Sequence, residues 1–323
     1  MKYKASIIVA LMFQILSHTF GVIPKHSEIY YEATRPEVHK AMRYGAKARI
    51  VYRVIDDEGN PITNTVVNGT WQNDYPRKIW QRKYKTDEKG CFIAEDKVGH
   101  SFACQIQKDG YYNSYDVVTF DWRAGVSPLV KDGKWQPYGE SRTVIVKRKK
   151  NQMDSSYLWY TVIDIPVTNI WLGFDLESFA WVKPYGKGEN SDMLLRFNSD
   201  PINRYSVNWA TMEVSFTNNP YAGFYIQEKD AYSEFKSVYH ADTNRIFRTD
   251  ITYSIGKSIQ EENLLDEKHY MVVRTRTKVN EEGELISAHY GKIYGRWGIW
   301  GGTRAQMMFF NPTPNDTNLE HKR

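Results

Sequence analysis

Three carboxylates in the second half of the chain have types and spacing suited to chemistry. Asp175 and Glu177 lie two positions apart, and Asp192 follows a stretch rich in Gly and Lys. Two carboxylic acids that flank a sugar bond carry out glycoside hydrolysis, and the same oxygens are ligands that Ca²⁺ prefers. The interpretation we favour is structural: Asp175 and Asp192 cap turns and pair with Lys183 or Lys187.

An aromatic, glycine-rich segment near the C-terminus is a second candidate site. The chain contains 10 Trp and 23 Tyr, and four of these rings lie among five glycines: Tyr290, Tyr294, Trp297 and Trp300. A flat ring with a polar edge suits stacking on a sugar, and Gly weakens a buried strand. We therefore predict a carbohydrate-binding site at these residues, with both Trp rings partly exposed. The alternative is that the rings fill a sandwich core, because aromatic residues are good strand formers.

Several enzyme and cofactor motifs are missing from the sequence. It has no CxxC pair, no Cys/His cluster and no HExxH, so we expect no metal site. It also lacks GxSxG, the phosphate-binding P-loop and the dinucleotide-binding fingerprint. We therefore predict that the protein uses no cofactor.

The N-terminus has the three parts of a signal peptide. Lys2 and Lys4 precede an apolar run from Ala5 to Leu16, and Thr19-Phe20-Gly21 provides small residues at positions −3 and −1 of a cut. The apolar run is too short to span a bilayer. We predict that export removes residues 1–21, leaving no membrane span, and that the protein is periplasmic, cell-surface or extracellular. The alternative is an uncleaved anchor.

The charge of the chain is modest. The net charge of +5 would fall to about +3 once Lys2 and Lys4 leave with the signal peptide. A nucleic-acid-binding domain normally carries a stronger and more clustered positive charge. The one basic run that we single out, residues 147–150, is interpreted as a solvated linker. We therefore predict no nucleic-acid partner.

The pattern of residues predicts an all-β protein with two domains. Residues 22–45 form a leader with a short helix from Pro36 to Tyr44, capped by Thr34 and ended by Gly45. Residues 46–150 form a first β-sandwich, and residues 151–323 form a second, sandwich-like domain. Short segments rich in Tyr and Val predict the strands of the second domain. They are Tyr157–Ile165, Met193–Phe197, Ala210–Phe216, Ala222–Gln227, Phe247–Ile255, Tyr270–Lys278 and Ile286–Gly295.

Three motifs in the first domain carry a family resemblance. They are Val54–Ile62, Thr86–Phe92 and Lys108–Tyr112, each with a Gly that can turn the chain at positive φ. A period-2 strand precedes the first motif and has Ala48, Ile50, Tyr52 and Val54 on one face. This order resembles the carboxypeptidase regulatory-like family. The resemblance implies a small transthyretin-like β-sandwich of a secreted or cell-surface protein, without catalytic machinery.

The second domain also has a resemblance. The segments 173–192 and 311–320 are similar to an uncharacterised family of exported bacterial proteins, in which an all-β region follows a carboxypeptidase regulatory-like domain. The resemblance spans most of the chain after the signal peptide but implies no activity.

The sequence does not decide whether its two cysteines, Cys91 and Cys104, form a disulfide. We expect their segments to pair as a hairpin, where the thiols would face each other and could oxidise after export. The alternation of side chains between the two faces of a strand argues against the bond. The family pattern implies that Phe92 points inward, so Cys91 would point outward, whereas Cys104 shares a face with Phe102 and its period-2 neighbours.

Together these features predict a non-catalytic exported envelope or adhesion protein that binds a polysaccharide or a surface protein. The alternative is a glycan-degrading enzyme that uses the carboxylates of the second domain.

Overall fold

The computed structural model describes residues 35–322, except for short gaps. The gaps are residues 75, 121–128, 155–156, 204–205, 218, 257–267, 296–297 and 300–302. The predicted signal peptide and most of the leader therefore lie outside the described residues. The chain folds into two compact units: unit 1 is residues 1–148 with Tyr232–Glu234, and unit 2 is residues 149–231 with 235–323.

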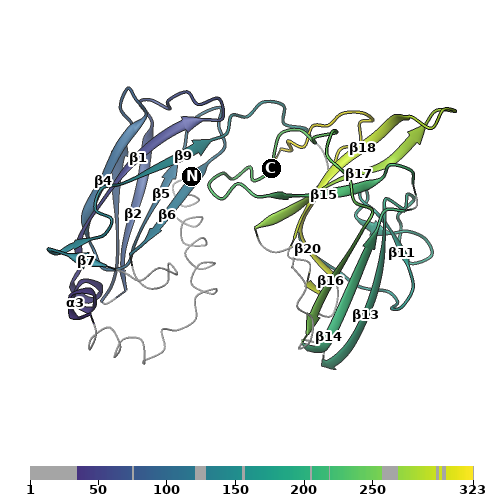
Figure 1. Ribbon diagram of the computed structural model, residues 1–323, viewed down its shortest axis with the longest axis horizontal. Coiled ribbons are helices and arrows are strands. Elements are labelled where there is room, and N and C mark those ends of the chain that lie inside the picture. The colour runs from purple at the N-terminus through teal and green to yellow at the C-terminus, as the bar shows by residue number, and fades with distance from the viewer. Residues whose placement is uncertain are drawn as a thin grey trace. The chain divides into compact units, whose positions relative to one another are not determined.

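Unit 1 contains a short helix and nine strands among the described residues. They are α3 (Pro36–Tyr44), β1 (Ala46–Asp56), β2 (Val66–Asp74), β3 (Arg77–Lys85), β4 (Cys91–Val98), β5 (Ser101–Ile106), β6 (Ser114–Thr119), β7 (Val130–Lys131), β8 (Lys134–Trp135) and β9 (Glu140–Val146). One sheet has the order β4-β1-β8-β7, with β9 parallel to β1. The other has the order β3-β2-β5-β6, and three of its strands, β2, β5 and β6, are labelled in Figure 1. Two facing sheets make unit 1 a β-sandwich.

The core of unit 1 lies between these two sheets. The alternating residues of β1 are buried as predicted, and the Tyr52 ring stacks on Phe92 of the same sheet with centroids 4.7 Å apart. Trp71 and Phe102, from the other sheet, pack with centroids 4.4 Å apart. Tyr52 and Phe102 meet across the sandwich at 6.0 Å.

The predicted turn glycines of unit 1 have the expected conformation. Gly59 has φ 87° and Gly90 has φ 74°, a region that side chains with a Cβ rarely adopt. A Cβ on Gly90 would also lie 2.5 Å from the Val54 carbonyl oxygen. Asp87 closes the second turn, since its Oδ1 accepts from the N–H of Cys91 at 2.7 Å.

The helix in the leader has the predicted bounds. Pro36 occupies the first turn, and the N–H of Gly45 donates to the Ala41 carbonyl at 2.8 Å. The N-cap position is Arg35, whose side chain makes no capping hydrogen bond, and the predicted capping residue, Thr34, lies outside the described residues. Proline in the first turn removes one of the N–H groups that a cap would satisfy.

The predicted cysteine hairpin is wrong, and the disulfide that the sequence left open is not formed. β4 pairs with β1, whereas β5 pairs with β2 and β6 in the opposite sheet. The chain therefore changes sheets between the two strands, and both cysteines are free. The argument from alternation holds, because Cys91 is half-buried and Cys104 is buried. Burial raises the pKa of the Cys104 thiol to about 12, which keeps it inert.

Unit 2 consists of strands in its described part. They are β10 (Tyr157–Ile163), β11 (Leu172–Asp175), β12 (Ala180–Trp181), β13 (Met193–Asn203), β14 (Ser206–Ser215), β15 (Gly223–Glu228), β16 (Asp250–Gly256), β17 (His269–Val279), β18 (Leu285–Tyr294), β19 (Gly298–Ile299) and β20 (Thr303–Phe310). All seven predicted segments of this domain contain a strand, whereas β11, β12, β19 and β20 were not predicted. The fold is all-β, as expected from the sequence.

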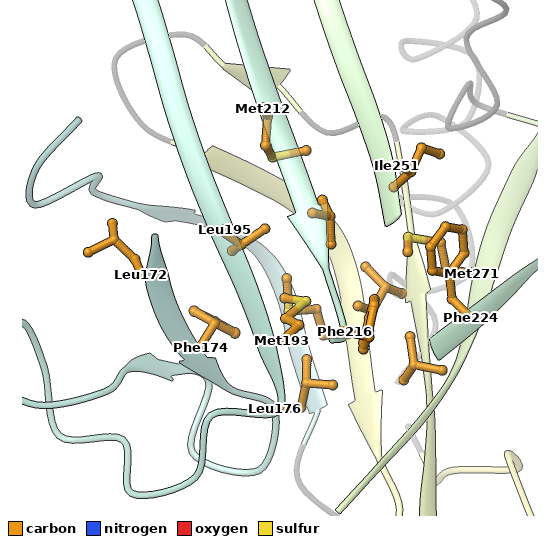
Figure 2. Packing of buried hydrophobic residues seen from close by; sticks show 14 of the residues in the cluster. Leu172, Phe174, Leu176, Met193, Leu195, Met212, Phe216, Phe224, Ile251 and Met271 are labelled. Carbon is orange, nitrogen blue, oxygen red and sulfur yellow. The ribbon is translucent and has the colours of Figure 1, made fainter. Parts of the chain in front are cut away.

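Two sheets again enclose a core in unit 2. One has the order β12-β11-β13-β14-β16, and the other has the order β10-β20-β18-β17-β15, with β19 beside β20. Figure 2 shows the side chains gathered between the strands, with Leu195 and Met212 from the first sheet and Phe224 and Met271 from the second. The second sheet is also covered on its other face, where Tyr270, Val272 and Leu319 form a separate buried cluster.

The boundary between the units differs slightly from the prediction at Lys150. Unit 1 takes in Tyr232–Glu234, a segment from the second half of the sequence. The N–H of Tyr115 in β6 donates to the Tyr232 carbonyl at 2.7 Å, and the N–H of Glu234 donates to the Asn113 carbonyl at 2.8 Å. The segment thus satisfies backbone groups at one edge of the sheet β3-β2-β5-β6.

The described part of the chain contains no helix with the length and apolarity that crossing a bilayer requires.

Candidate functional site

The three carboxylates singled out in the sequence meet at one arginine, Arg276 of β17. Its Nε donates to Asp192 Oδ1 at 2.9 Å, and its Nη2 donates to Asp192 Oδ2 at 3.0 Å. Nη2 also reaches Asp175 Oδ1 at 3.1 Å. Nη1 donates to Glu177 Oε2 at 2.5 Å. We call these four residues the Arg276 cluster.

A local irregularity of β17 brings Arg276 to the carboxylates. The register with β18 shifts between Thr275 and Lys278, and Arg276 has φ 47°. Such a bulge bends a strand and redirects its side chains. The guanidinium lies over the Phe310 ring, 4.5 Å from its centroid, which adds a cation–π contact to the ion pairs.

Asp175 also holds the loop that follows β11. Its Oδ1 accepts from the N–H of Glu177 at 2.9 Å, and its Oδ2 accepts from the N–H of Glu189 at 2.9 Å and of Asn190 at 3.2 Å. The predicted turn-capping role of Asp175 is therefore confirmed. The predicted pairing with Lys183 or Lys187 is wrong, because Arg276 occupies that place.

Asp192 is the more deeply buried acid. Its Oδ2 accepts from the N–H of Leu176 at 2.8 Å, and its Oδ1 accepts from the Thr275 hydroxyl at 3.2 Å. Together with the two bonds from Arg276, these contacts occupy both carboxylate oxygens. The Asp192 side chain has 0% exposed surface.

The environments of the two aspartates shift their pKa values in opposite directions. Burial alone would raise the pKa of Asp175, but the backbone N–H donors outweigh it and the pKa is lowered. Burial raises the pKa of Asp192, and Arg276 offsets only part of that effect. Opposite shifts are typical of an acid–base pair in catalysis. Here, however, the oxygens are already bonded and buried, so a sugar cannot reach them, and the cluster acts as a structural tie.

No metal site accompanies the cluster. Within the described ranges, no three His, Cys, Asp or Glu side chains are arranged to hold an ion. A Ca²⁺ ion needs six to eight oxygen ligands, whereas the oxygens of Asp175 and Asp192 already accept hydrogen bonds from Arg276 and from backbone N–H groups.

The predicted aromatic platform does not include its two tyrosines. Tyr290 is 4% exposed and Tyr294 is 3% exposed. Both belong to the buried cluster on the second face of the sheet, where Tyr294 lies 5.1 Å from Tyr270. Trp297 and Trp300 lie outside the described residues. The glycines that suggested a surface are compatible with a buried strand because Gly291 packs closely: a Cβ there would lie 2.6 Å from the Phe309 carbonyl oxygen.

The structure presents a different aromatic surface on the sheet β12-β11-β13-β14-β16. Leu195 and Met212 of this sheet face the core, so the residues that alternate with them face solvent. Trp171, just before β11, is 41% exposed, and Trp209 of β14 is 38% exposed. We call the solvent side of this sheet the outer face.

Polar side chains lie between the two indoles. Asn198 of β13 and Thr211 of β14 are paired there, and Ser254 continues the row on β16, beyond the strand of Trp209. These side chains provide both hydrogen-bond donors and acceptors. Beside them, Arg196 makes a bidentate pair with Glu213, with Nε–Oε1 at 3.1 Å and Nη2–Oε2 at 2.5 Å.

The register of the strands gives the span of the outer face. Arg196 lies over the Trp171 ring, 4.8 Å from its centroid, and Trp209 pairs with Asp200, four positions further along β13. Four residues of strand cover about 14 Å, and two strand spacings cover about 10 Å. The backbones that carry the two indoles are therefore about 17 Å apart.

Sequence reasoning missed the outer face. The alternation of Leu195 and Phe197 with polar residues was a usable signal, because it predicts a sheet with one solvent-facing side. The sequence did not show that Trp171 and Trp209 lie on the same side of one sheet, since 38 positions separate them.

No family model and no curated protein matches the chain. Among solved structures, chlorocatechol 1,2-dioxygenase from Pseudomonas putida is 14% identical over 32% of this chain and 61% of its own, with a TM-score of 0.26. A shaft pilin, spaA, from Lactobacillus rhamnosus GG is 8% identical over 76% of this chain and 92% of its own, at a TM-score of 0.23. A candidate carbohydrate-binding protein from Bacteroides uniformis is 9% identical over 84% of this chain and 100% of its own, at a TM-score of 0.19.

This chain spans about three-fifths of the length of the dioxygenases that it matches. At these TM-scores the likenesses carry no conclusion about function.

Proposed function

We propose that this protein is an exported, non-catalytic surface protein that binds a polysaccharide through the outer face of unit 2. The observation that carries the proposal is the pair of exposed indoles, Trp171 and Trp209, at the two ends of a polar sheet surface. An indole presents an apolar face with a polar edge, which suits the C–H face of a sugar ring. The side chains between the indoles suit its hydroxyls.

The charge of the outer face favours an uncharged sugar polymer. Arg196 and Glu213 neutralise each other, and the row of Asn198, Thr211 and Ser254 carries no charge. Asp200, which pairs with Trp209, adds a negative charge that would repel an anionic polymer. The core of a typical protein interface is more apolar and excludes water. A partner protein therefore fits this face less well than a hydrated polymer does.

The Arg276 cluster favours binding over catalysis. A glycosidase needs two carboxylic acids that a sugar can reach from both sides. Asp192 has no exposed side-chain surface, and the Asp175 side chain is 4% exposed. The Glu177 side chain is 50% exposed, so the alternative of a glycan-degrading enzyme would have to combine Glu177 with an acid outside the cluster.

Export and the family of unit 1 are part of the same proposal. The N-terminal pattern of Lys2, Lys4 and an apolar run supports a cleaved signal peptide. The two-sheet sandwich of unit 1, with positive φ at Gly59, Gly90 and Gly110, supports a carboxypeptidase regulatory-like domain. N-terminal sequencing of the exported chain should begin at or near Val22.

The test is binding of the purified chain to a glycan array, with reducing-sugar release followed in parallel. Trp171→Ala and Trp209→Ala should each weaken binding about tenfold or more, since an aromatic anchor contributes about 2 kcal/mol and about 1.4 kcal/mol corresponds to a factor of ten. The matched control is Tyr44→Ala in α3 of unit 1, a ring that is 62% exposed, which should bind as the parent does.

Three results would count against the proposal. Release of reducing ends would favour the enzyme. Normal binding by both Trp variants would move the site elsewhere. Absence of binding to every glycan would remove the polysaccharide as ligand.

A further inference from the structure

The strand β3 of unit 1 is an unusually charged sheet edge. Its nine residues are all exposed or half-exposed. Five of them are cations, and no acid occurs between residues 75 and 86. The five are Arg77, Lys78, Arg82, Lys83 and Lys85.

The backbone of β3 is regular and, among the described residues, paired on one side alone. It pairs with β2 at nine successive positions, from Val66↔Lys85 to Asp74↔Arg77, without a register shift. The sheet order β3-β2-β5-β6 places it at the end. Alternate N–H and C=O groups of such a strand point away from its neighbour, so they are free to form another ladder.

The opposite edge of the same sheet, β6, is covered by another segment of the chain. β6 has six residues, and the segment Tyr232–Glu234 lies against it with hydrogen bonds of 2.7 and 2.8 Å and a bridge between Ser114 and Ser233. This edge therefore already receives added backbone from a distant part of the chain, and one of the added residues, Glu234, is acidic. No described segment does the same for β3.

Proteins usually protect sheet edges with short strands, proline, bulges or charge. β3 keeps its length and regularity and has only the charge. Five cations in nine residues also put positive charge on both faces of the strand. Positive charge that repels an identical strand attracts an acidic one.

The cations of β3 are largely uncompensated. In the part of the chain that the structure describes, Arg82 alone of the five makes an ion pair, with Asp96 at 3.0 Å, and its side chain stays 58% exposed. Alternation along the strand puts Lys78 and Arg82 on one face and Arg77, Lys83 and Lys85 on the other. Between them, Ile79 is 47% exposed and offers an apolar contact at mid-strand.

From these observations we propose that β3 accepts an extended, acidic peptide segment of a partner protein as an additional strand. Backbone hydrogen bonds along the edge would supply affinity, as in other cases of strand addition. The cations on both faces would select carboxylate side chains. This surface is separate from the outer face of unit 2, so the two proposals stand independently.

The probe is a labelled seven-residue peptide of alternating Glu and Val, titrated with the full exported chain by fluorescence anisotropy. Binding should weaken as salt rises, because the pairs are exposed. N-methylation of alternate amides in the peptide should abolish binding, since it removes donors from the ladder. Lys83→Glu/Lys85→Glu should lower affinity at least tenfold.

The matched control is Lys47→Glu/Lys97→Glu, which reverses two exposed charges on the opposite sheet of unit 1. It should bind the peptide as the parent does. If the N-methylated peptide binds equally well, the strand attracts any anionic polymer and the proposed strand addition is wrong. Failure of the peptide to bind at low salt would mean that the charge serves only to keep copies of the chain apart.

Discussion

Two arginine–carboxylate groups of unit 2 have opposite surroundings. Arg276 is 18% exposed, and its partner Asp192 is 0% exposed. Arg196 and Glu213 on the outer face are 39% and 31% exposed. Asp175 of the first group lies only four positions after Trp171 of the second region.

The difference shows how burial, rather than residue type, sets the role of a charged pair. A buried carboxylate without its partner is costly because it has lost its water. An exposed pair remains hydrated and contributes little, so its side chains stay available to a ligand. The Arg276 cluster therefore joins β11, the loop after it and β17, whereas the outer face is free to bind.

The largest effect should follow from Arg276→Met. The substitution keeps much of the side-chain volume but leaves Asp192 buried and unpaired. We expect the free energy of unfolding to fall by about 3–5 kcal/mol, measured by urea denaturation. A loss below about 1 kcal/mol would mean that the cluster behaves like a surface pair, and the contrast between the two regions would fail.

A second substitution should recover part of this loss. Asp192→Asn removes the buried charge while keeping an acceptor for the N–H of Leu176. In the Arg276→Met background it should be less harmful than in the parent, with a coupling energy of about 1–3 kcal/mol. Denaturation of the four proteins in this cycle measures the coupling. Additive effects would show that the two side chains do not act together.

His289 extends the comparison to pH. Burial lowers its pKa, and Arg276 lowers it further. A histidine with a depressed pKa in the folded state binds fewer protons than it does when unfolded. The protein should therefore lose stability as the pH falls below about 6.5, the ordinary value. Titration of His289 by NMR should give a pKa below that value, and Arg276→Met should raise it. A pKa that is unchanged by the substitution would contradict this link.

The smallest effect should follow from Arg196→Met. Since the Arg196–Glu213 pair is exposed, we expect no resolvable change in the denaturation midpoint. The same variant should still weaken glycan binding, because Arg196 lies over Trp171. A clear loss of stability here would place the outer face among the structural parts of the molecule.

Local features of the fold could be predicted from the sequence with good accuracy. The helix Pro36–Tyr44 and the period-2 face of β1 appeared at their expected positions. They depend on neighbouring residues alone, namely proline in a first turn and alternation along a strand. The cap of Asp175 is of the same kind, since three of its four N–H donors lie within fourteen positions.

Features that depend on distant residues could not be predicted. Asp192 and Arg276 are 84 positions apart, and nothing near Asp192 favoured Arg276 over the lysines that we expected. The predicted cysteine hairpin failed because adjacent strands can belong to different sheets, which alternation alone does not reveal. The prediction that Tyr290 and Tyr294 bind a ligand failed for a related reason. Both faces of their sheet are covered, so neither ring reaches the surface.

By itself, the sequence determined where most of the strands and turns lie, which residues share a strand face, and that the protein is all-β. These properties follow from the period of two along a strand and from the backbone freedom of glycine. Only the tertiary structure decided which faces meet water, which carboxylates are buried, and which edges remain open. Those outcomes depend on what packs against each face, and packing partners come from anywhere in the chain.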